Sequence, residues 1–219
     1  MSQAVANADT VQYEKVVPKD ELYQKYSEWA IDAQYEQDLC ETNYRAPLIA
    51  AEAMADLFPE AVRKDLYILD IAAGTGLVAG HLKNRGFVRM DALEPVENMI
   101  NVVKSKNLYL RTFQNFLGED SGYIEPDYDA VVVCGGMSPG HIPCSGLDEM
   151  IRLTKPGGRV IIVMYKKYLT SVEEFNGRLE PRMKQLELEG KWEAVSRRVE
   201  PNYYHGGDGA VFIFKVTGK

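Results

Sequence analysis

Short apolar runs alternate with helix-like segments over much of the chain. Five of these runs have the length of strands and lie at residues 66–71, 87–93, 108–113, 128–134 and 159–165. The segments 77–83, 97–103 and 147–153 repeat apolar residues at helical spacing. Strands that alternate with helices in this way form a parallel sheet covered by helices. The pattern therefore predicts an α/β fold.

The chain is expected to end in a hairpin of two strands. Residues 191–199 and 210–216 are rich in strand-forming residues, and His205-Gly206-Gly207-Asp208-Gly209 between them suits a turn. Ahead of the hairpin, Ser171 is expected to cap a long helix. His205 has two interpretations, because loop geometry and a position beside a ligand crevice explain it equally well.

Two amphipathic helices are expected ahead of the first strand. Asp20 is a candidate N-cap of the first, and Pro47 suits the first turn of the second, which spans residues 48–57. The polar segment 35–42 between them is expected to form loops. Residues 1–19 are polar and small without periodicity, so they are expected to form a disordered tail.

These two helices are expected to form either a flank that packs on the sheet or a lid over a ligand. As a lid, they would turn Tyr35, Tyr44 or Arg45 toward the ligand. Both alternatives stay open at this point. The expected organisation is a single domain over residues 20–219, with a helical cap at 20–64 and a sheet core at 65–219.

The first strand runs into a turn of small residues, Asp70-Ile71-Ala72-Ala73-Gly74-Thr75-Gly76. Small residues let the backbone approach a ligand, and the helix that starts near Leu77 offers unpaired N–H groups. Glu94-Pro95 ends the second strand, 18 positions after Gly76. A carboxylate at that place can accept hydrogen bonds from the two hydroxyls of a ribose. The alternative is an ordinary surface glutamate.

Further candidate residues follow the later strands. Met99 is either core or a surface for an adenine ring, and Asn115 and Phe116 suit the edge and face of that ring. The glycine-rich loop that begins at Cys134-Gly135 permits close approach of a ligand. His141 in this loop has a side chain suited to general-base work near neutral pH, and its alternative is a hydrogen-bonded surface histidine.

The composition narrows the choice of partner. The 219 residues are 46% hydrophobic and 26% charged, with a formal net charge of −7 and no run of Lys or Arg. Nucleic acid and anionic membranes are therefore not expected partners; a small-molecule substrate is favoured, and a protein substrate is the alternative. Three cysteines without C-x-x-C spacing predict a reducing compartment, the cytoplasm or else the nucleus. No metal site is predicted.

Two cofactor classes fit the glycine turn. The run from Gly74 to Ala79 satisfies G-x-G-x-x-A, so an NAD-dependent oxidoreductase is one alternative. Three features favour another ligand. Asp70 at the strand end suits a cationic amino-acid group, roughly 65 mostly helical residues precede the turn, and the terminal hairpin leaves no second βαβαβ half.

Four motifs occur in order at suitable spacing: Asp70 to Gly76, Glu94, Tyr128-Asp129-Ala130-Val131 and Lys155-Pro156-Gly157-Gly158. With them the chain resembles the class I S-adenosylmethionine-dependent methyltransferases, from about residue 22 to the C-terminus. It is similar in particular to the Williams–Beuren syndrome region methyltransferase-like proteins, through Trp29-Ala30, Tyr44-Arg45-Ala46-Pro47, Ile142-Pro143-Cys144 and Lys191-Trp192-Glu193.

The resemblance implies a Rossmann-like, doubly wound sheet of seven strands, mostly parallel with an antiparallel last strand. It also implies S-adenosylmethionine as the cofactor and methyl transfer as the reaction, with a non-catalytic cofactor-binding regulator as an alternative. Carried over by position, the residues that would contact the cofactor are Asp70 to Gly76 at the methionine moiety, Glu94 at the ribose, Asn115 and Phe116 at adenine, Cys134 and Gly135 at the methionine side, and Arg45 at the carboxylate.

Two positions depart from the family pattern. Ala72 stands where the family usually has its first glycine, and because one methyl group is small, the turn is expected to survive if this residue keeps a negative φ. Asn115 stands where many members have Asp, and its amide is a weaker acceptor for the adenine amino group.

Overall fold

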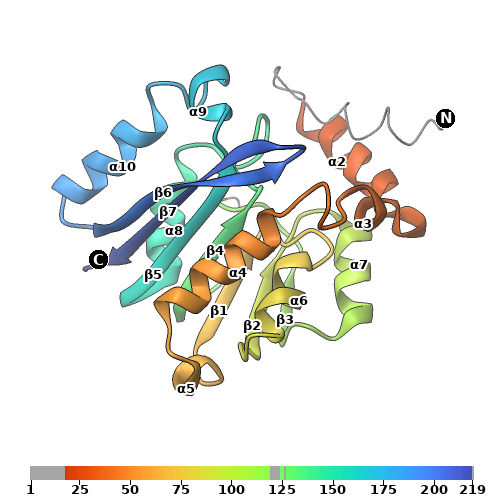
Figure 1. Cartoon of the computed structure of the whole chain (residues 1–219), viewed down its shortest axis with the longest axis horizontal. Helices are drawn as coiled ribbons and strands as arrows, with labels where there is room; N and C mark the ends of the chain where they lie inside the picture. The colour runs from red at the N-terminus through yellow and green to blue at the C-terminus, as the bar shows by residue number, and fades with distance from the viewer. Residues whose placement is uncertain (1–17, 119–123, 126, 219) are drawn as a thin grey trace.

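The computed structural model describes residues 18–118, 124, 125 and 127–218 (Figure 1). The tail expected over residues 1–19 lies outside this part of the chain, apart from its last two residues. Within the described residues, no helix is both long and apolar enough to cross a membrane.

A seven-stranded sheet forms the centre of the molecule, in the order β3-β2-β1-β4-β5-β7-β6. The strands are β1 (Tyr67–Ile71), β2 (Arg89–Leu93), β3 (Arg111–Phe113), β4 (Tyr128–Cys134), β5 (Thr154–Tyr165), β6 (Trp192–Tyr204) and β7 (Gly207–Val216). The first five are mutually parallel, and β7 runs antiparallel to both of its neighbours. The predicted fold class and the terminal hairpin are therefore confirmed.

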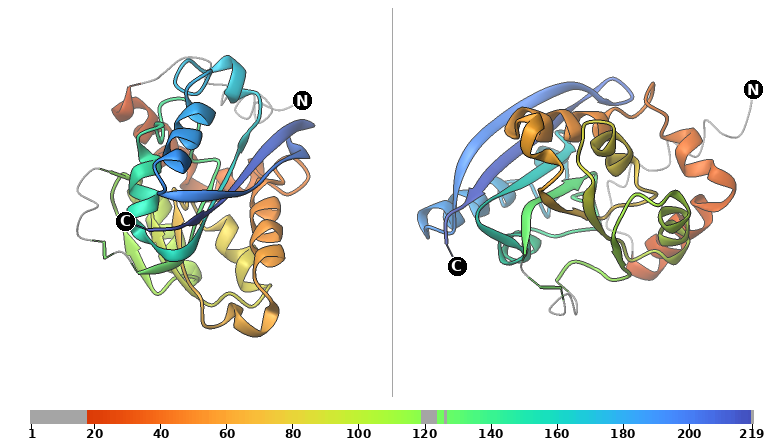
Figure 2. Two further views of the ribbon diagram at one scale, coloured as in Figure 1. Left: turned by 90° about the vertical axis from the view of Figure 1, so that its left-hand side faces the viewer. Right: turned by 90° about the horizontal axis from the view of Figure 1, so that it is seen from below.

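Helices cover both faces of the sheet (Figures 1 and 2). They are α2 (Lys19–Trp29), α3 (Gln34–Asp38), α4 (Ala46–Leu57), α5 (Glu60–Arg63), α6 (Leu77–Lys83), α7 (Glu97–Lys106), α8 (Gly146–Leu153), α9 (Tyr168–Ser171) and α10 (Leu179–Leu188). Two core clusters result from the alternation of side chains along the strands. In β1, Ile68 packs with residues of α4 and α6, whereas Leu69 packs with residues of α8 and α10.

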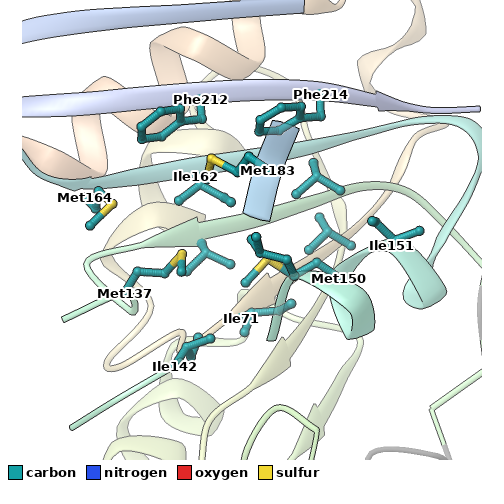
Figure 3. Close-up of a cluster of buried hydrophobic side chains, with 14 of the residues drawn as sticks. Ile71, Met137, Ile142, Met150, Ile151, Ile162, Met164, Met183, Phe212 and Phe214 are labelled. Atoms are coloured by element: carbon teal, nitrogen blue, oxygen red, sulfur yellow. The ribbon is translucent and has the colours of Figure 1, made fainter. Parts of the chain in front are cut away.

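Figure 3 shows the second of these cores, between the sheet and α8 and α10. Phe212 and Phe214 of β7 and Ile162 of β5 face Met150 of α8 and Met183 of α10. All five side chains are at most 5% exposed. This packing fixes β4 and β5, and with them the loops at their carboxyl ends.

Three local expectations prove wrong, one of them only in part. Helix α2 begins one residue before Asp20, with Pro18 as its N-cap and no side-chain cap, because the carbonyl of Pro18 accepts the first helical N–H, from Leu22. The first part of segment 35–42 is helical, because α3 extends to Asp38, whose carboxylate accepts hydrogen bonds from Trp29 at 2.8 Å and Gln34 at 2.7 Å. Residues 39–42 form the loop that was expected.

Ser171 ends a helix instead of capping one. Helix α9 stops there, and α10 starts only at Leu179. Between them Val172 adopts an extended conformation, and both Val172 and Phe175 insert into the core at 3% and 2% exposure. Burial of these two side chains therefore outweighs continuation of the helix.

Strand β5 begins earlier than expected, since Thr154 already pairs with Tyr128 of β4. The register then shifts, so that Ala130 pairs with Arg159, and the Lys155-Pro156-Gly157-Gly158 cluster occupies this irregularity. The cluster therefore serves as turn chemistry inside a strand pair.

The two N-terminal helices expected as a flank or a lid occupy different positions. Helix α4 is a flank, because it packs on the sheet beside α6. Helix α2 instead docks on α7 (Figure 1), where Asn98 donates to Ser27 and the Tyr23 hydroxyl accepts from the backbone N–H of Glu97. Lys106 ties α3 to the glycine turn, since its ammonium pairs with Glu36 and donates to the carbonyl of Thr75 at 2.7 Å.

Candidate functional site

A cavity of about 630 Å³ lies where β1, β2 and β4 end, beneath α2. Ten of the predicted site residues line it: Ala72, Gly74, Glu94, Pro95, Met99, Asn115, Phe116, Cys134, Gly135 and His141. Three others, Arg45, Asp70 and Gly76, are not among the lining residues. Parallel strands bring their carboxyl ends to one edge of a sheet, and this explains why motifs far apart in the sequence converge.

The turn after β1 is held by residues with positive φ. Gly74 has a φ of +57°, and a Cβ there would lie 3.3 Å from the Tyr35 hydroxyl. Ala72 has a φ of +55°, so the condition of a negative φ is not met. The turn keeps its shape despite the alanine, and the left-handed conformation costs about 1–2 kcal/mol in a residue with a Cβ. The glycine usual in the family avoids this cost.

Glu94 is buried at the end of β2, with 5% exposure. One carboxylate oxygen accepts the backbone N–H of Gly74 and the other accepts that of Val96, both at 2.9 Å. Burial nevertheless raises the pKa of Glu94 to about 7, because desolvation outweighs these two hydrogen bonds. The side chain is therefore fixed against the turn, and its charge is not neutralised by any of the contacts just described.

Asp70 lies beneath the turn and is 1% exposed. One of its oxygens accepts a hydrogen bond from the Tyr109 hydroxyl at 2.7 Å. The other oxygen is buried and has no hydrogen-bond partner among the described residues. Burial raises the pKa of Asp70 to about 7 although the bond from Tyr109 lowers it, and the nearby Glu94 raises it further. Sequence reasoning did not identify Tyr109, because its contact with Asp70 joins separate elements.

One end of the cavity is apolar and bears the residues expected beside adenine. Met99 is fully buried and packs with Ala30 and Val96. The side-chain oxygen of Asn115 accepts the backbone N–H of Phe116 at 2.7 Å. The Lys19 ammonium lies 5.0 Å from the centre of the Phe116 ring. This end therefore offers a buried thioether, an aromatic ring and an oriented amide.

The other end of the cavity holds a group of aromatic side chains that we call the tyrosine cluster: Tyr44, Tyr165, Tyr168, Tyr203 and Tyr204. Neighbouring ring centres lie 5.3 to 6.3 Å apart, mostly edge to face, with Tyr165 and Tyr203 stacked. The cluster joins the cap, β5, α9 and the β6–β7 hairpin. Only the tertiary fold assembles these residues, so local patterns in the sequence gave no signal for the group.

The tyrosine cluster adjoins the glycine after β4. Gly135 has a φ of +73°, and a Cβ there would lie 2.5 Å from the Tyr44 hydroxyl and 3.6 Å from that of Tyr203. The Cys134 thiol has a raised pKa because of its burial. Of the three cap residues expected to face a ligand, Tyr35 and Tyr44 therefore do so, while Arg45 is not among the lining residues.

His141 lines the cavity with both ring nitrogens engaged. Nδ1 lies 2.9 Å from the Pro139 carbonyl and 2.9 Å from the Ser138 hydroxyl, and Nε2 lies 3.0 Å from the Tyr26 hydroxyl. Since a carbonyl can only accept, Nδ1 carries the proton and Nε2 accepts from Tyr26. Burial lowers the pKa of His141. The second candidate, His205, is exposed in the hairpin turn and is not among the lining residues.

A second buried carboxylate, Asp91 of β2, lies apart from the cavity lining. It is fully buried and accepts the hydroxyls of Tyr67 at 2.6 Å and Tyr128 at 2.8 Å. The Arg111 guanidinium pairs with the same carboxylate at 2.8 Å. This network joins three strands, and its bonds are satisfied within the core, so it is structural.

Comparisons with known proteins agree with this geometry. A family model described as a methyltransferase domain matches residues 68–158. The human "Methyltransferase-like protein 27" is 33% identical over 171 residues, which cover 78% of this chain and 67% of the human protein.

Solved structures show the same fold. A Burkholderia thailandensis 1,6-didemethyltoxoflavin-N1-methyltransferase, bound to 1,6-didemethyltoxoflavin and S-adenosylhomocysteine, has a TM-score of 0.62 at 17% identity, covering 93% of this chain and 92% of that one. A Haloferax volcanii protein described as a methyltransferase, in complex with the activator Trm112, has a TM-score of 0.64 at 13% identity, covering 88% and 98%.

Proposed function

Because the chain belongs to the class I S-adenosylmethionine-dependent methyltransferases, we propose that it methylates a small molecule inside the cavity described above. The observation that carries this proposal is the division of that cavity. One end has the groups that suit an adenosine, and the tyrosine cluster lines the other end, in a cavity whose total volume suits small molecules. Neither the fold nor the comparisons favour the nicotinamide alternative or the non-catalytic one.

The residues at the first end fit the cofactor. The partnerless oxygen of Asp70 is buried and does not line the cavity, so it would reach the ammonium of a methionine moiety through a bridging water. The glycines at 74 and 135 leave room that a side chain would fill. We propose that Glu94 accepts the ribose hydroxyls and that Met99, Asn115 and Phe116 contact the adenine. Arg45 has no support from the cavity lining, and in its place Tyr35 and Tyr44 close the methionine side.

When bound, S-adenosylmethionine would supply an electrophilic methyl group, which passes to a nucleophile in line with the C–S bond as S-adenosylhomocysteine leaves. The work of the protein is then to align the acceptor and to exclude water. Residues of helix α2 and the tyrosine cluster both line the cavity, where they reduce the contact of a bound acceptor with water. The bond from Tyr26 to His141 holds α2 to the loop after β4. His141 Nε2 is also the candidate base for an acceptor that must lose a proton inside the cavity.

Isothermal titration calorimetry of the full chain with S-adenosylhomocysteine tests this proposal. We expect saturable binding at one site, and no comparable heat with NAD or NADH. The absence of heat and of a thermal shift at saturating S-adenosylhomocysteine would refute the proposed site. Binding of NAD in its place would support the oxidoreductase alternative.

A further inference from the structure

We propose that the tyrosine cluster is the acceptor site and that the acceptor is an amine, methylated on its nitrogen. The inference rests on the proposed function, because it takes the neighbouring end of the cavity as the cofactor site. It names a chemical class of substrate, which neither the sequence nor the name of the human Methyltransferase-like protein 27 specifies. Three sets of observations support it.

The first is position. The hydroxyl of Tyr44 lies directly over Gly135, on the methionine side of the proposed cofactor site, and its ring meets those of Tyr203 and Tyr204 edge to face. Tyr165 and Tyr168 extend the wall from β5 and α9. The reacting methyl group belongs to the methionine end of the cofactor. An acceptor must therefore approach from this side.

The second is charge. Among the described residues that line the cavity there is no arginine, and Lys19, the one lysine, lies at the other end over Phe116. Glu174 also lines the cavity, and its carboxylate accepts the backbone N–H of Cys144 at 2.8 Å. Among the described residues that line this end of the cavity, none carries a positive charge that could pair with a carboxylate or phosphate on the acceptor. The faces of tyrosine rings, however, attract cations.

The third is protonation. The tyrosines at 35, 44 and 203 have raised pKa values because they are buried, and burial lowers the pKa of His141. The cavity therefore favours neutral forms of acids and bases alike. A neutral amine has the lone pair that attack requires. A neutral alcohol, phenol or thiol must first lose a proton, and the candidate base, His141 Nε2, is already bonded to Tyr26.

The step balances without an additional reagent. The amine lone pair forms the new N–C bond while the C–S bond of the methyl donor breaks and its electron pair stays on sulfur. The positive charge passes from sulfur to nitrogen, and the product leaves as an ammonium ion. A primary or secondary amine leaves its ammonium proton in bulk water before it reacts, and its methylated product stays an ammonium ion near neutral pH. The tyrosine cluster lines the part of the cavity where this nitrogen would lie, so its rings would stabilise the charge as it forms.

The test compares two probes that differ only in charge: choline, which carries a quaternary ammonium, and 3,3-dimethylbutan-1-ol, its uncharged carbon isostere. Each is titrated into the full chain saturated with S-adenosylhomocysteine. We expect choline to bind about 2- to 30-fold more tightly than the isostere, which is the range of a cation–aromatic contact. Equal affinity, tighter binding of the alcohol, or no binding of choline would each overturn the proposal.

Two variants show which residues cause the preference. Tyr168→Leu removes one half-buried ring of the cluster and is expected to reduce the choline preference, whereas Tyr168→Phe keeps the ring and is expected to retain it. An unchanged preference in Tyr168→Leu would contradict the assignment of this ring. S-adenosylhomocysteine binding separates the two proposals: its loss in the wild type refutes the proposed function, and its presence without a choline preference refutes only the amine.

Discussion

Replacing Glu94 by glutamine removes a charge from the proposed ribose site with little change of shape. In the structure two backbone N–H groups hold the carboxylate, each at 2.9 Å, so it is already oriented before a ligand arrives. Hydrogen bonds to a charged group contribute about 1.5–3 kcal/mol. We therefore expect Glu94→Gln to weaken S-adenosylhomocysteine binding by about 10- to 150-fold.

The pH dependence of binding gives a second signature of the same residue. Burial raises the pKa of Glu94 to about 7, so the free protein binds a proton here at pH 6. Hydroxyls that donate to the carboxylate favour its charged form and lower its pKa in the complex. Binding then releases a proton, and affinity rises as the pH increases from about 5.5 to 7. The glutamine variant loses this contribution.

Stability of the ligand-free protein changes in the opposite direction. The folded pKa of Glu94 lies above its ordinary value of 4.5, so the folded state binds more protons than the unfolded state between pH 4.5 and 7. The stabilising contribution is complete below pH 4.5 and is lost as the pH rises through 7, and a shift of this size corresponds to about 3 kcal/mol. Asp70 contributes with the same sign.

Calorimetric titrations of S-adenosylhomocysteine between pH 5.5 and 8.5 measure the loss of affinity in Glu94→Gln and the pH dependence of binding. Glu97→Gln is the matched control, because Glu97 is exposed and lies only three positions away. We expect the control to bind like the wild type at every pH. If folded Glu94→Gln binds within about twofold of the wild type, the ribose assignment is wrong. Wild-type affinity that does not change with pH would contradict the linkage.

Three further predictions concern other residues. Ala72→Gly relieves a left-handed alanine and is expected to raise the free energy of unfolding by about 0.5–1 kcal/mol in urea titrations; a loss of stability would show that φ is not strained. Asp91→Ala leaves the Tyr67 and Tyr128 hydroxyls without an acceptor and is expected to cost about 3 kcal/mol; a change below about 1 kcal/mol would show that the network adds little. His141→Ala is expected to spare S-adenosylhomocysteine affinity and to slow methylation of an amine, measured by release of S-adenosylhomocysteine, by less than about tenfold, because it loosens Tyr26. A loss of 10²–10⁴-fold is typical of a general base and would contradict the amine assignment.

Features with a local signal could be predicted from the sequence. The apolar period locates β1, β2 and β4, and parallel strands must place their ends together, so Glu94 and the glycine turn converge without further information. The helix at 77–83 was predicted with the bounds that the structure shows. These predictions required only the neighbours of each residue along the chain.

Features that depend on tertiary contacts could not be predicted in the same way. The bond from Tyr109 to Asp70 and the tyrosine cluster join residues that are far apart in the sequence. Segment 35–42 is polar in sequence, yet α3 extends to Asp38, whose carboxylate accepts a hydrogen bond from the Trp29 indole. At Ala72 the composition of the turn indicated its shape but not the sign of φ, because the surrounding structure imposes a conformation that alanine alone disfavours.

A crystal structure of the full chain with S-adenosylhomocysteine tests the central claim most directly. We predict that the ribose hydroxyls lie within hydrogen-bond distance of Glu94 and that the adenine lies beside Met99 and Phe116. The sulfur should lie near Gly135 and face the tyrosine cluster. A ligand bound elsewhere, or one whose sulfur points away from the tyrosine cluster, would contradict the account.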